Sequence, residues 1–509
     1  MWASMTPAIE LIGIDKRFGP VHANKDVTLA IGKGSIHGIV GENGAGKSTL
    51  MSILFGFYAA DKGGIRVDGK PVKIGSSADA IAHGIGMVHQ HFMLVDPFTV
   101  LENVVLGAEG GGLIGPALVK ARTELERLAR DYELDVDPDV MVGTLPVGLQ
   151  QRVEILKALF RGAEVLILDE PTGVLTPGEA DHLFRILGQL KDQGKTVIFI
   201  THKLREIMAI TDHVSVMRRG ELVATRKTKD TTVEELAELM VGRRVLLRVE
   251  KGRAKPGKTI LSVENLTVKD RRGVARVNNV SFSVRAGEIV GIAGVSGNGQ
   301  SELLEAIAGI QKPASGRILL EGHDLCAASD PADARRRGVA HVPEDRQHRG
   351  LVTSFDASES AILGWHHDPE LGHGFRLDRG AVIARCKAGM EEFDVRPADP
   401  LLLSAKFSGG NQQKIILARE IGCDPKLLIV GQPTRGVDIG AVEFIHRRLI
   451  ELRDQGKAIV LVSVELDEIR SLSDRILVMF DGMIMGERDA TTDEGELGCL
   501  MAGVIGEAA

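Results

Sequence analysis

The stretch Gly41-Glu42-Asn43-Gly44-Ala45-Gly46-Lys47-Ser48 decides the fold of this chain. It matches the phosphate-binding pattern G-x-x-x-x-G-K-[ST] at every fixed position, between an apolar run at strand spacing and one at helical spacing. Backbone N–H groups of such a loop converge on an anion at a helix N-terminus. Lys47 would reach the β and γ phosphates, and the Ser48 hydroxyl would ligate Mg²⁺, with Thr49 next to them. The sequence therefore predicts a nucleoside-triphosphate site.

An altered copy of this stretch occurs at Gly294-Val295-Ser296-Gly297-Asn298-Gly299-Gln300-Ser301. It keeps the outer glycines Gly294 and Gly299 and the serine Ser301, but Gln300 stands where the pattern has lysine. A glutamine side chain carries no charge, so this copy lacks the cationic group that contacts the phosphates in the first loop. The phosphate-binding sequence thus occurs twice in this chain, once complete and once altered.

Further repeats divide the chain into two halves. Residues 9–14 open the first half much as residues 261–266 open the second, and short β-branched runs recur in both. Buried apolar runs such as Val165–Leu168 are typical of parallel strands covered by helices. A chain of 509 residues is also too long for one ordinary core. We therefore expect an α/β fold of two tandem domains, 1–247 and 259–509, joined by a linker, 248–258, that is too polar to pack.

Composition excludes several classes of protein. The net charge of −7 argues against a mainly nucleic-acid-binding protein. The four cysteines form no C-x-x-C pair and predict neither a disulfide framework nor a zinc site. No apolar run approaches the roughly 20 residues that span a bilayer, and the N-terminus lacks the features of a signal peptide. We expect a cytoplasmic protein that reaches a membrane only by docking.

Two acids and a histidine follow buried strands in the first half. Asp169 and Glu170 come directly after the run 165–168, and His202 follows the run 196–200. A carboxylate at such a strand end can hold Mg²⁺ or its water, and the next one can polarise an attacking water. The imidazole of His202 could contact the γ phosphate. Together with the phosphate loop, these residues predict hydrolysis of ATP.

The segment Phe407-Ser408-Gly409-Gly410-Asn411-Gln412-Gln413-Lys414 resembles the signature sequence of ATP-binding-cassette (ABC) proteins. With the loop, the acids, Gln90 and His202, it completes that family's set, and the likeness covers nearly the whole chain in two copies. The details resemble the fused ATPase subunits of bacterial importers for simple sugars and nucleosides. The segments 87–100, 149–157 and 342–346 favour the nucleoside branch. The resemblance implies two P-loop ATPase domains, each with a mixed or parallel sheet flanked by helices and with a helical subdomain.

In this family the loop of one cassette faces the signature of the other. The resemblance therefore implies a first site in which Ser48, Gln90 and Asp169 hold Mg²⁺ and Glu170 and His202 are catalytic. Its nucleotide would also be bound by the loop residues 41–49 and by signature-side residues of the second half, namely Ser408, Gly409, Gly410, Gln412 and Asp438. Every part of this site is present. Asp438 occupies the position of an acid that reaches toward the opposite nucleotide.

The second site collects the departures from the family pattern. Gly431 replaces the magnesium aspartate, Gln432 the catalytic glutamate and Val464 the histidine, while Glu344 holds the position that Gln90 has in the first half. The signature facing this site has Pro146, which offers neither hydroxyl nor backbone N–H, and Thr176 replaces the acid that Asp438 supplies elsewhere. We expect negligible hydrolysis there, and the residues leave open whether ATP binds.

Phe18 precedes the loop, where the family stacks an aromatic ring on adenine. Such stacking contributes roughly 1–3 kcal/mol by analogy with nucleic-acid-binding surfaces. An alternative is that Phe18 belongs to the core. A second pair of interpretations concerns four apolar residues after Gln90. They line a groove that receives a short helix from a membrane partner, or they belong to the core: Phe92, Met93, Leu94 and Phe98.

The resemblance implies the ATP-hydrolysing motor subunit of an importer for nucleosides or simple sugars. Its partners would be two integral-membrane permease subunits and, indirectly, an external solute-binding protein. It would act at the cytoplasmic face of the membrane with ATP and Mg²⁺ and without nucleic acid. The alternative is a soluble cassette protein such as a translation factor, which would carry two complete sites and a long charged bridge between them.

Overall fold

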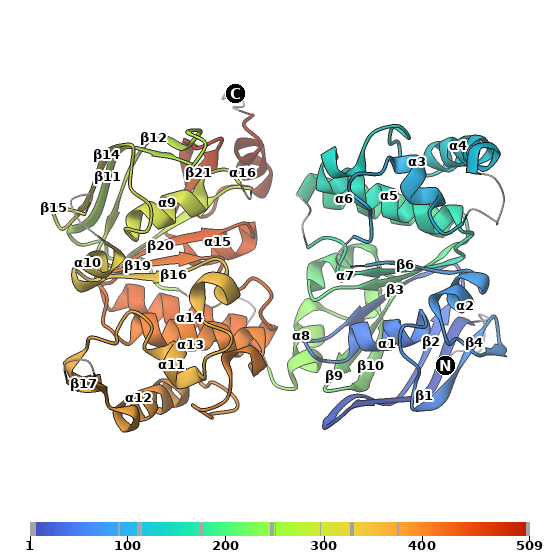
Figure 1. Cartoon of the computed structure of the whole chain (residues 1–509), viewed down its shortest axis with the longest axis horizontal. Coiled ribbons are helices and arrows are strands. Elements are labelled where there is room, and N and C mark those ends of the chain that lie inside the picture. Colours follow the sequence, from blue (N-terminus) through green and yellow to red (C-terminus); the bar gives the residue numbers. More distant parts are fainter. Residues whose placement is uncertain are drawn as a thin grey trace. The chain divides into compact units, whose positions relative to one another are not determined.

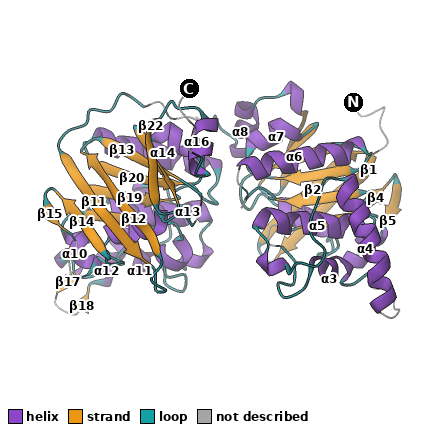
Figure 2. Ribbon diagram, turned by 90° about the horizontal axis from the view of Figure 1, so that it is seen from above, coloured by secondary structure: helices purple, strands orange, loops and turns teal. Residues whose placement is uncertain are grey.

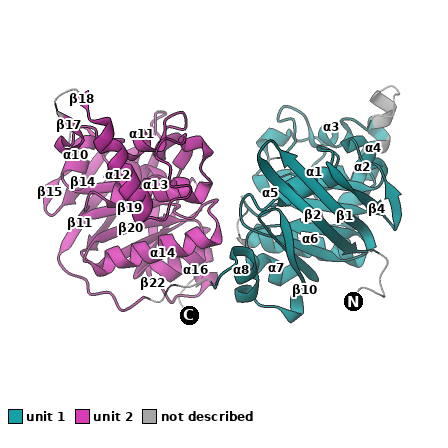
Figure 3. Cartoon of the chain, turned by 90° about the horizontal axis from the view of Figure 1, so that it is seen from below, with its two compact units in different colours: residues 1–245 teal, residues 246–509 magenta. Residues whose placement is uncertain are grey.

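The computed structural model describes residues 7–89, 92–108, 114–173, 175, 177–244, 249, 251–295, 297–325, 330–373 and 376–504. The chain divides into two compact units, Met1–Val245 (unit 1) and Leu246–Ala509 (unit 2), which Figure 3 colours separately. Helices and strands are interspersed in both units (Figure 2), so each is an α/β body, as the sequence predicts.

The main sheet of unit 1 has the order β10-β9-β3-β8-β7-β6 within the described residues. All neighbouring strands are parallel except β9 and β10. The strands β3, β7 and β8 are buried along their whole length, which confirms the predicted parallel core. The bounds are β3 (Ile36–Val40), β6 (Ile85–Val88), β7 (Val165–Asp169), β8 (Thr196–Ile200), β9 (His213–Arg218) and β10 (Glu221–Lys227).

A second sheet in unit 1 is antiparallel, with the order β2-β1-β4-β5 in the described region. Its strands are β1 (Pro7–Phe18), β2 (Val21–Gly32), β4 (Lys62–Val67) and β5 (Lys70–Val72). Apolar side chains of β1, including Ile9 and Leu11, share one core with Leu50 and Met51 of the helix that follows the phosphate loop. The antiparallel sheet therefore anchors the base of that loop.

The helices of unit 1 are α1 (Lys47–Leu54), α2 (Ser77–Ala82), α3 (Val100–Val105), α4 (Ile114–Asp131), α5 (Val147–Phe160), α6 (Pro177–Asp192), α7 (Leu204–Ile210) and α8 (Val233–Val241). Helices α3, α4 and α5 pack against one another (Figure 1). They form the helical subdomain that the family resemblance implies.

Unit 2 repeats this architecture. Its main sheet has the order β16-β19-β20-β13-β21-β22, which matches that of unit 1 strand for strand across the described residues, and its antiparallel sheet has the order β12-β11-β14-β15. The strands are β11 (Thr259–Lys269), β12 (Ala275–Arg285), β13 (Glu288–Ala293), β14 (Ser315–Leu320), β15 (His323–Asp324), β16 (Val339–Val342), β19 (Leu427–Gly431), β20 (Ala458–Ser463), β21 (Arg475–Phe480) and β22 (Met483–Asp489), with a small hairpin of β17 (Gly372–His373) and β18 (Arg376–Leu377). The shared order confirms that the chain is a tandem repeat.

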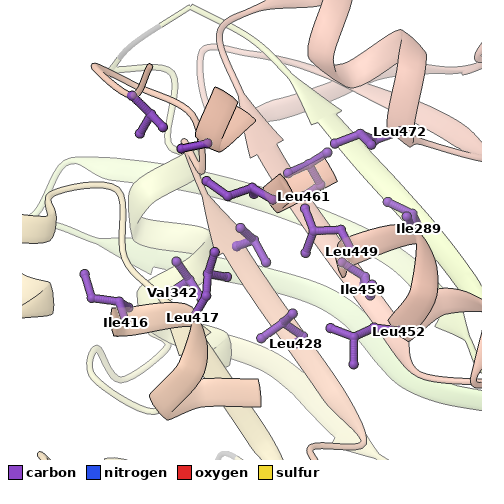
Figure 4. Packing of buried hydrophobic residues seen from close by; sticks show 14 of the residues in the cluster. Ile289, Val342, Ile416, Leu417, Leu428, Leu449, Leu452, Ile459, Leu461 and Leu472 are labelled. Atoms are coloured by element: carbon purple, nitrogen blue, oxygen red, sulfur yellow. The ribbon is translucent and has the colours of Figure 1, made fainter. Parts of the chain in front are cut away.

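The helices of unit 2 are α9 (Gln300–Ile307), α10 (Pro331–Arg336), α11 (Ala357–Ala361), α12 (Arg379–Glu392), α13 (Gly409–Ile421), α14 (Ile439–Asp454), α15 (Leu466–Leu472) and α16 (Glu494–Met501). Figure 4 shows part of the core that joins α11, α12, α13, α14, α15 and α16 to the sheet. Val342 of β16, Leu417 of α13 and Leu428 of β19 belong to this core and are less than 1% exposed. The core thus fixes the strand ends and the helix start that carry the predicted site residues.

The segment predicted as a linker packs against unit 2. Val249 is half-buried against its core, Lys251 donates a hydrogen bond to the carbonyl oxygen of Ser473, and Arg453 donates one to the carbonyl oxygen of Gly252 at 3.0 Å. The expectation that this segment is too polar to pack is therefore wrong, because buried polar groups of unit 2 supply partners for it.

Candidate functional site

The phosphate loop of unit 1 leads from β3 into α1, and its lysine is buried. Lys47 is 6% exposed, and its ammonium donates hydrogen bonds to the carbonyl oxygens of Gly41 (2.8 Å) and Glu42 (3.1 Å). Burial lowers the pKa of Lys47, while the Glu170 and Asp169 carboxylates act in the opposite direction. The lysine is thus held over the loop, close to the predicted acids.

Gly46 is required by the geometry of the loop. It precedes α1 with φ of 96°, and a Cβ there would lie 2.2 Å from the carbonyl oxygen of Ala23. The Asn24 side-chain amide donates a hydrogen bond to the Gly46 carbonyl at 3.1 Å in a buried setting. Asn24 on β2 was not among the predicted site residues, because its place beside the loop depends on the antiparallel sheet.

Asp169 is the last residue of β7 and is 7% exposed. It accepts a hydrogen bond from the Ser48 hydroxyl. Burial raises the pKa of the Asp169 carboxyl group, and the hydrogen bond from Ser48 acts in the opposite direction. A buried carboxylate beside a hydroxyl at a phosphate loop suits Mg²⁺, which takes oxygen ligands and binds through one or two carboxylates plus phosphates. The described residues contain no group of three or more His, Cys, Asp or Glu that could hold a metal ion.

Glu170 and His202 lie together at the ends of β7 and β8. Nδ1 of His202 is hydrogen-bonded to Oε1 of Glu170 at 2.9 Å, and this bond lowers the pKa of the Glu170 carboxyl. Glu170 has φ of 47°, and its backbone N–H donates to the Ile200 carbonyl at 2.8 Å. A non-glycine residue in this conformation is uncommon and costs about 1–3 kcal/mol. This backbone conformation and the contact with His202 together hold the Glu170 carboxylate at the strand end.

Phe18 ends β1 and is 41% exposed. Its ring packs edge-on against Tyr58 at a centroid distance of 5.1 Å, with the ammonium of Lys16 5.4 Å from its centroid. The alternative that Phe18 belongs to the core is therefore wrong. Stacking on adenine stays a prediction.

Gln90 and Thr176 lie outside the described residues. Of the four groove candidates, Met93 and Phe98 are exposed, so the interpretation as core residues is wrong for these two. Phe92 and Leu94 are half-buried, and both interpretations stay open for them. Met93 lines a pocket of about 280 Å³ together with apolar and cationic side chains. Its other lining residues are Phe55, Phe57, Ser77, Ile81, Ile85, Gly86, Met87, His89, Glu154, Lys157, Ala158, Arg161 and Ala163.

The start of α9 in unit 2 repeats the glycine geometry of unit 1 with different side chains. Gly299 precedes α9 with φ of 97°, and a Cβ there would lie 2.0 Å from the Arg276 carbonyl oxygen. The Gln300 side chain folds back against the loop, since a Cβ on Gly294 would lie 2.0 Å from its Nε2. The close glycine approach at the helix start is thus kept without the lysine.

The strand ends of unit 2 also keep the backbone of unit 1. Gln432 has φ of 48°, and its N–H donates to the Val462 carbonyl at 2.8 Å, as Glu170 does to Ile200. The Gln432 side-chain oxygen accepts a hydrogen bond from the Val464 N–H at 3.3 Å. A neutral amide bonded to the backbone offers no base, so this strand end cannot polarise water as that of unit 1 can.

The signature of unit 2 forms the start of α13. Ser408 caps this helix, and its hydroxyl accepts a hydrogen bond from the Asn411 side chain at 2.9 Å. A Cβ on Gly410 would lie 2.6 Å from Oδ2 of Asp438, so these predicted residues are brought together. Gln412 is 2% exposed and donates to the Ser404 carbonyl at 3.0 Å, which supports the loop from within.

Arg346 is a second residue near this site that the sequence did not single out. Its guanidinium donates hydrogen bonds to the carbonyl oxygens of Arg435 (2.5 Å) and Gly436 (3.4 Å), and a Cβ on Gly409 would lie 2.6 Å from it. In the degenerate signature of unit 1, by contrast, Pro146 caps α5 with no side-chain hydrogen bond. The two helix starts therefore differ as the motifs predict.

Comparison with known families identifies both units. The model of the ABC transporter family matches residues 24–173 and 277–435, which contain both phosphate loops and the signature of each unit. The chain belongs to the ABC transporter family. It is an ATPase subunit of the type in which two cassettes are fused.

Relatives align with this ABC subunit over nearly its whole length. The nucleoside import ATP-binding protein NupA of Lactococcus lactis is 49% identical over 97% of this chain and 98% of the relative. The guanosine import ATP-binding protein NupO of Bacillus subtilis is 48% identical over 98% of each. The glucose import ATP-binding protein TsgD13 of Haloferax volcanii is 45% identical over 98% of this chain and 96% of its own.

Proposed function

We propose that this chain is the ATP-hydrolysing motor subunit of an importer for nucleosides. The observation that carries the proposal is the Glu170–His202 pair beside a complete phosphate loop. The relatives with the highest identities reported above are named for nucleoside and guanosine import, whereas those named for ribose import reach 39–41%. Simple sugars are the second substrate class.

As the family resemblance implies, one nucleotide would be bound by the loop residues of unit 1 and by the signature residues of unit 2, from this chain or from a second copy of it. Unit 1 supplies Lys47, Ser48, Gln90, Asp169, Glu170 and His202, and the signature of unit 2 supplies Ser408, Gly409 and Gly410, with Asp438 beside them. This pairing is supported by the places at which the sequence departs from the family pattern. The altered residues lie in the loop and strand ends of unit 2 and in the signature of unit 1, which together make up the second site. Ser408 lies at the N-terminus of a 13-residue helix, where a hydroxyl and backbone N–H groups favour a phosphate.

Each residue of this site has a chemical task. Lys47 binds the β and γ phosphates, and Glu170 accepts the proton of the attacking water while His202 orients the carboxylate. Because the pKa of Glu170 is lowered, the carboxylate is ionised and ready to accept a proton at neutral pH. Ser48, Gln90 and Asp169 would hold Mg²⁺, which neutralises charge on the phosphates when bound.

ATP favours the arrangement in which both halves contact it, and cleavage removes that preference. A change between the two arrangements can be transmitted to permeases that dock on the chain. The 280 Å³ pocket of unit 1 is the surface that we assign to one permease, because exposed Phe57 and Met93 line it beside Lys157. The structure describes no helix that is long and apolar enough to cross a membrane. By its likeness to import ATP-binding proteins, the chain would act peripherally, at the cytoplasmic face of the membrane.

The test is reconstitution of the full chain with two candidate permease subunits, in lipid nanodiscs. ATP hydrolysis should rise when a nucleoside-loaded binding protein is added, and less when the same protein is offered ribose. The Glu170→Gln complex is the matched control and should show no response. Stimulation by ribosomes rather than by the membrane partners would overturn the proposal in favour of a translation factor.

A further inference from the structure

Unit 2 has no aspartate at the end of β19, but a carboxylate from a neighbouring strand lies in the same place. The Ser301 hydroxyl donates a hydrogen bond to Oε2 of Glu344 at 2.5 Å. In unit 1 the corresponding Ser48 hydroxyl donates to Asp169. Each phosphate loop therefore presents its serine to one acidic side chain.

The sheet register explains how Glu344 reaches this position. Strands β16 and β19 are parallel, with Val342 paired to Val430. Two residues further along, Glu344 comes level with Gln432 at the carboxyl end of the sheet, which is where the phosphate loop also lies. The carboxylate thus comes from the adjacent strand instead of from β19 itself.

The glycine at position 431 is what makes room for it. A Cβ on Gly431 would lie 2.5 Å from Cγ of Glu344, and Gly431 has no positive φ that would itself require glycine. An aspartate at 431 and Glu344 in its present place would therefore collide. The Glu344 side chain therefore occupies the space that an aspartate side chain at position 431 would need.

These residues fit a magnesium ion. Ser301 and Glu344 offer a hydroxyl and a carboxylate oxygen at the edge of a loop that keeps the close glycine approach at its helix start. Mg²⁺ is commonly held by one or two such ligands together with phosphate oxygens and water. No further protein ligand is needed for a metal that arrives with a nucleotide.

We propose that Glu344 replaces the missing aspartate as the magnesium ligand of the second site, so that this site holds Mg²⁺–ATP without cleaving it. The proposal rests on the proposed ATPase function and adds a ligand to the site that lost its catalytic residues. Cleavage is absent because Gln432 stands where the base would be and Val464 where the histidine would be. Binding and hydrolysis are thereby separated between the two sites.

Mn²⁺ electron paramagnetic resonance on the full chain tests this inference, with Mn²⁺–ATP as the probe. A Glu170→Gln background prevents turnover, and in it we expect Mn²⁺–ATP at both sites. Glu344→Ala should weaken the second Mn²⁺ more than about tenfold, since even outer partners of a metal contribute roughly 10–100-fold. Glu264→Gln, which removes an exposed carboxylate of β11, is the matched control and should keep both ions.

A rescue variant separates loss of the ligand from loss of the fold. In Glu344→Ala/Gly431→Asp the collision is removed and the aspartate restored, so the second Mn²⁺ should return. Two bound Mn²⁺–ATP in Glu344→Ala, or a failure of the rescue in a variant with unchanged thermal unfolding, would overturn the inference. If unaltered chains bind Mn²⁺–ATP at one site only, the inference also fails while the ATPase proposal stands. Absence of nucleotide from both sites would contradict the ATPase proposal itself.

Discussion

Nδ1 of His202 and Oε1 of Glu170 lie 2.9 Å apart at the ends of two neighbouring parallel strands. This contact joins Glu170, which we propose as the base, to His202, which we propose as its orienting partner. Its counterpart in unit 2 is a backbone N–H of Val464 bonded to the amide oxygen of Gln432.

Glu170→Gln should abolish ATP turnover while preserving ATP binding. Loss of a positioned base costs on the order of 10²–10⁴ in rate, and the second site offers no alternative base. Phosphate release and binding of a fluorescent ATP analogue measure the two properties separately. Near-normal turnover in this variant would show that the hydrolytic site has been wrongly assigned.

Gln432→Glu in the Glu170→Gln background should restore no hydrolysis. The backbone at position 432 already has the required conformation, but Gln300 and Val464 replace the lysine and the histidine. A carboxylate alone would therefore lack both the phosphate contact and its orienting partner. Phosphate release from the double variant is the measurement, with the Glu170→Gln chain as its reference, and turnover at even a tenth of the unaltered rate would refute the expectation.

The acid limb of the pH–rate profile should move when His202 is changed. The hydrogen bond from His202 lowers the pKa of Glu170, so the active carboxylate persists to a pH below the usual range of glutamate. In His202→Ala this bond is lost, the pKa rises, and activity should fall off at a higher pH than in the unaltered chain. A glutamine at position 202 can still donate a hydrogen bond to Glu170. In His202→Gln the activity should therefore fall off at a pH closer to that of the unaltered chain. An unshifted limb in His202→Ala would argue that another group controls it.

Gly46→Ala should destabilise unit 1 and prevent ATP binding. The left-handed conformation costs a non-glycine residue about 1–2 kcal/mol, and here the added Cβ would also meet the Ala23 carbonyl oxygen at 2.2 Å. Gly44→Ala is the matched control, since Gly44 also has positive φ, at 81°, but has no neighbouring atom within 4 Å of its would-be Cβ. Thermal unfolding and nucleotide titration of both variants should differ clearly, and equal behaviour would show that the close approach is unimportant.

Much of the fold follows from short sequence patterns. The run 165–168 predicts a buried parallel strand, and β7 is such a strand. The antiparallel sheets were not predicted, because strands such as β1 pair with partners far along the chain and their registers contain several shifts. The packing of Val249, Lys251 and Gly252 was missed for a similar reason, since the partners of Lys251 and Gly252 come from the loop after α15 and from α14.

The candidate site shows the same division. Motif spacing placed Lys47, Asp169 and Glu170 correctly near one another, because each follows a strand of one parallel sheet. Glu344 was identified only as the occupant of a family position. Its contact with Ser301 and its use of the space above Gly431 depend on the register between β16 and β19, which no motif encodes.

The matching φ values at Glu170 and Gln432, 47° and 48°, show that this backbone conformation does not depend on the side chain at the strand end. A non-glycine residue held in it costs about 1–3 kcal/mol. In both units the backbone N–H of this residue donates a hydrogen bond to the neighbouring strand, at the carbonyl oxygens of Ile200 and Val462. The change from glutamate to glutamine therefore removes the carboxylate from unit 2 without reshaping the peptide that carries it.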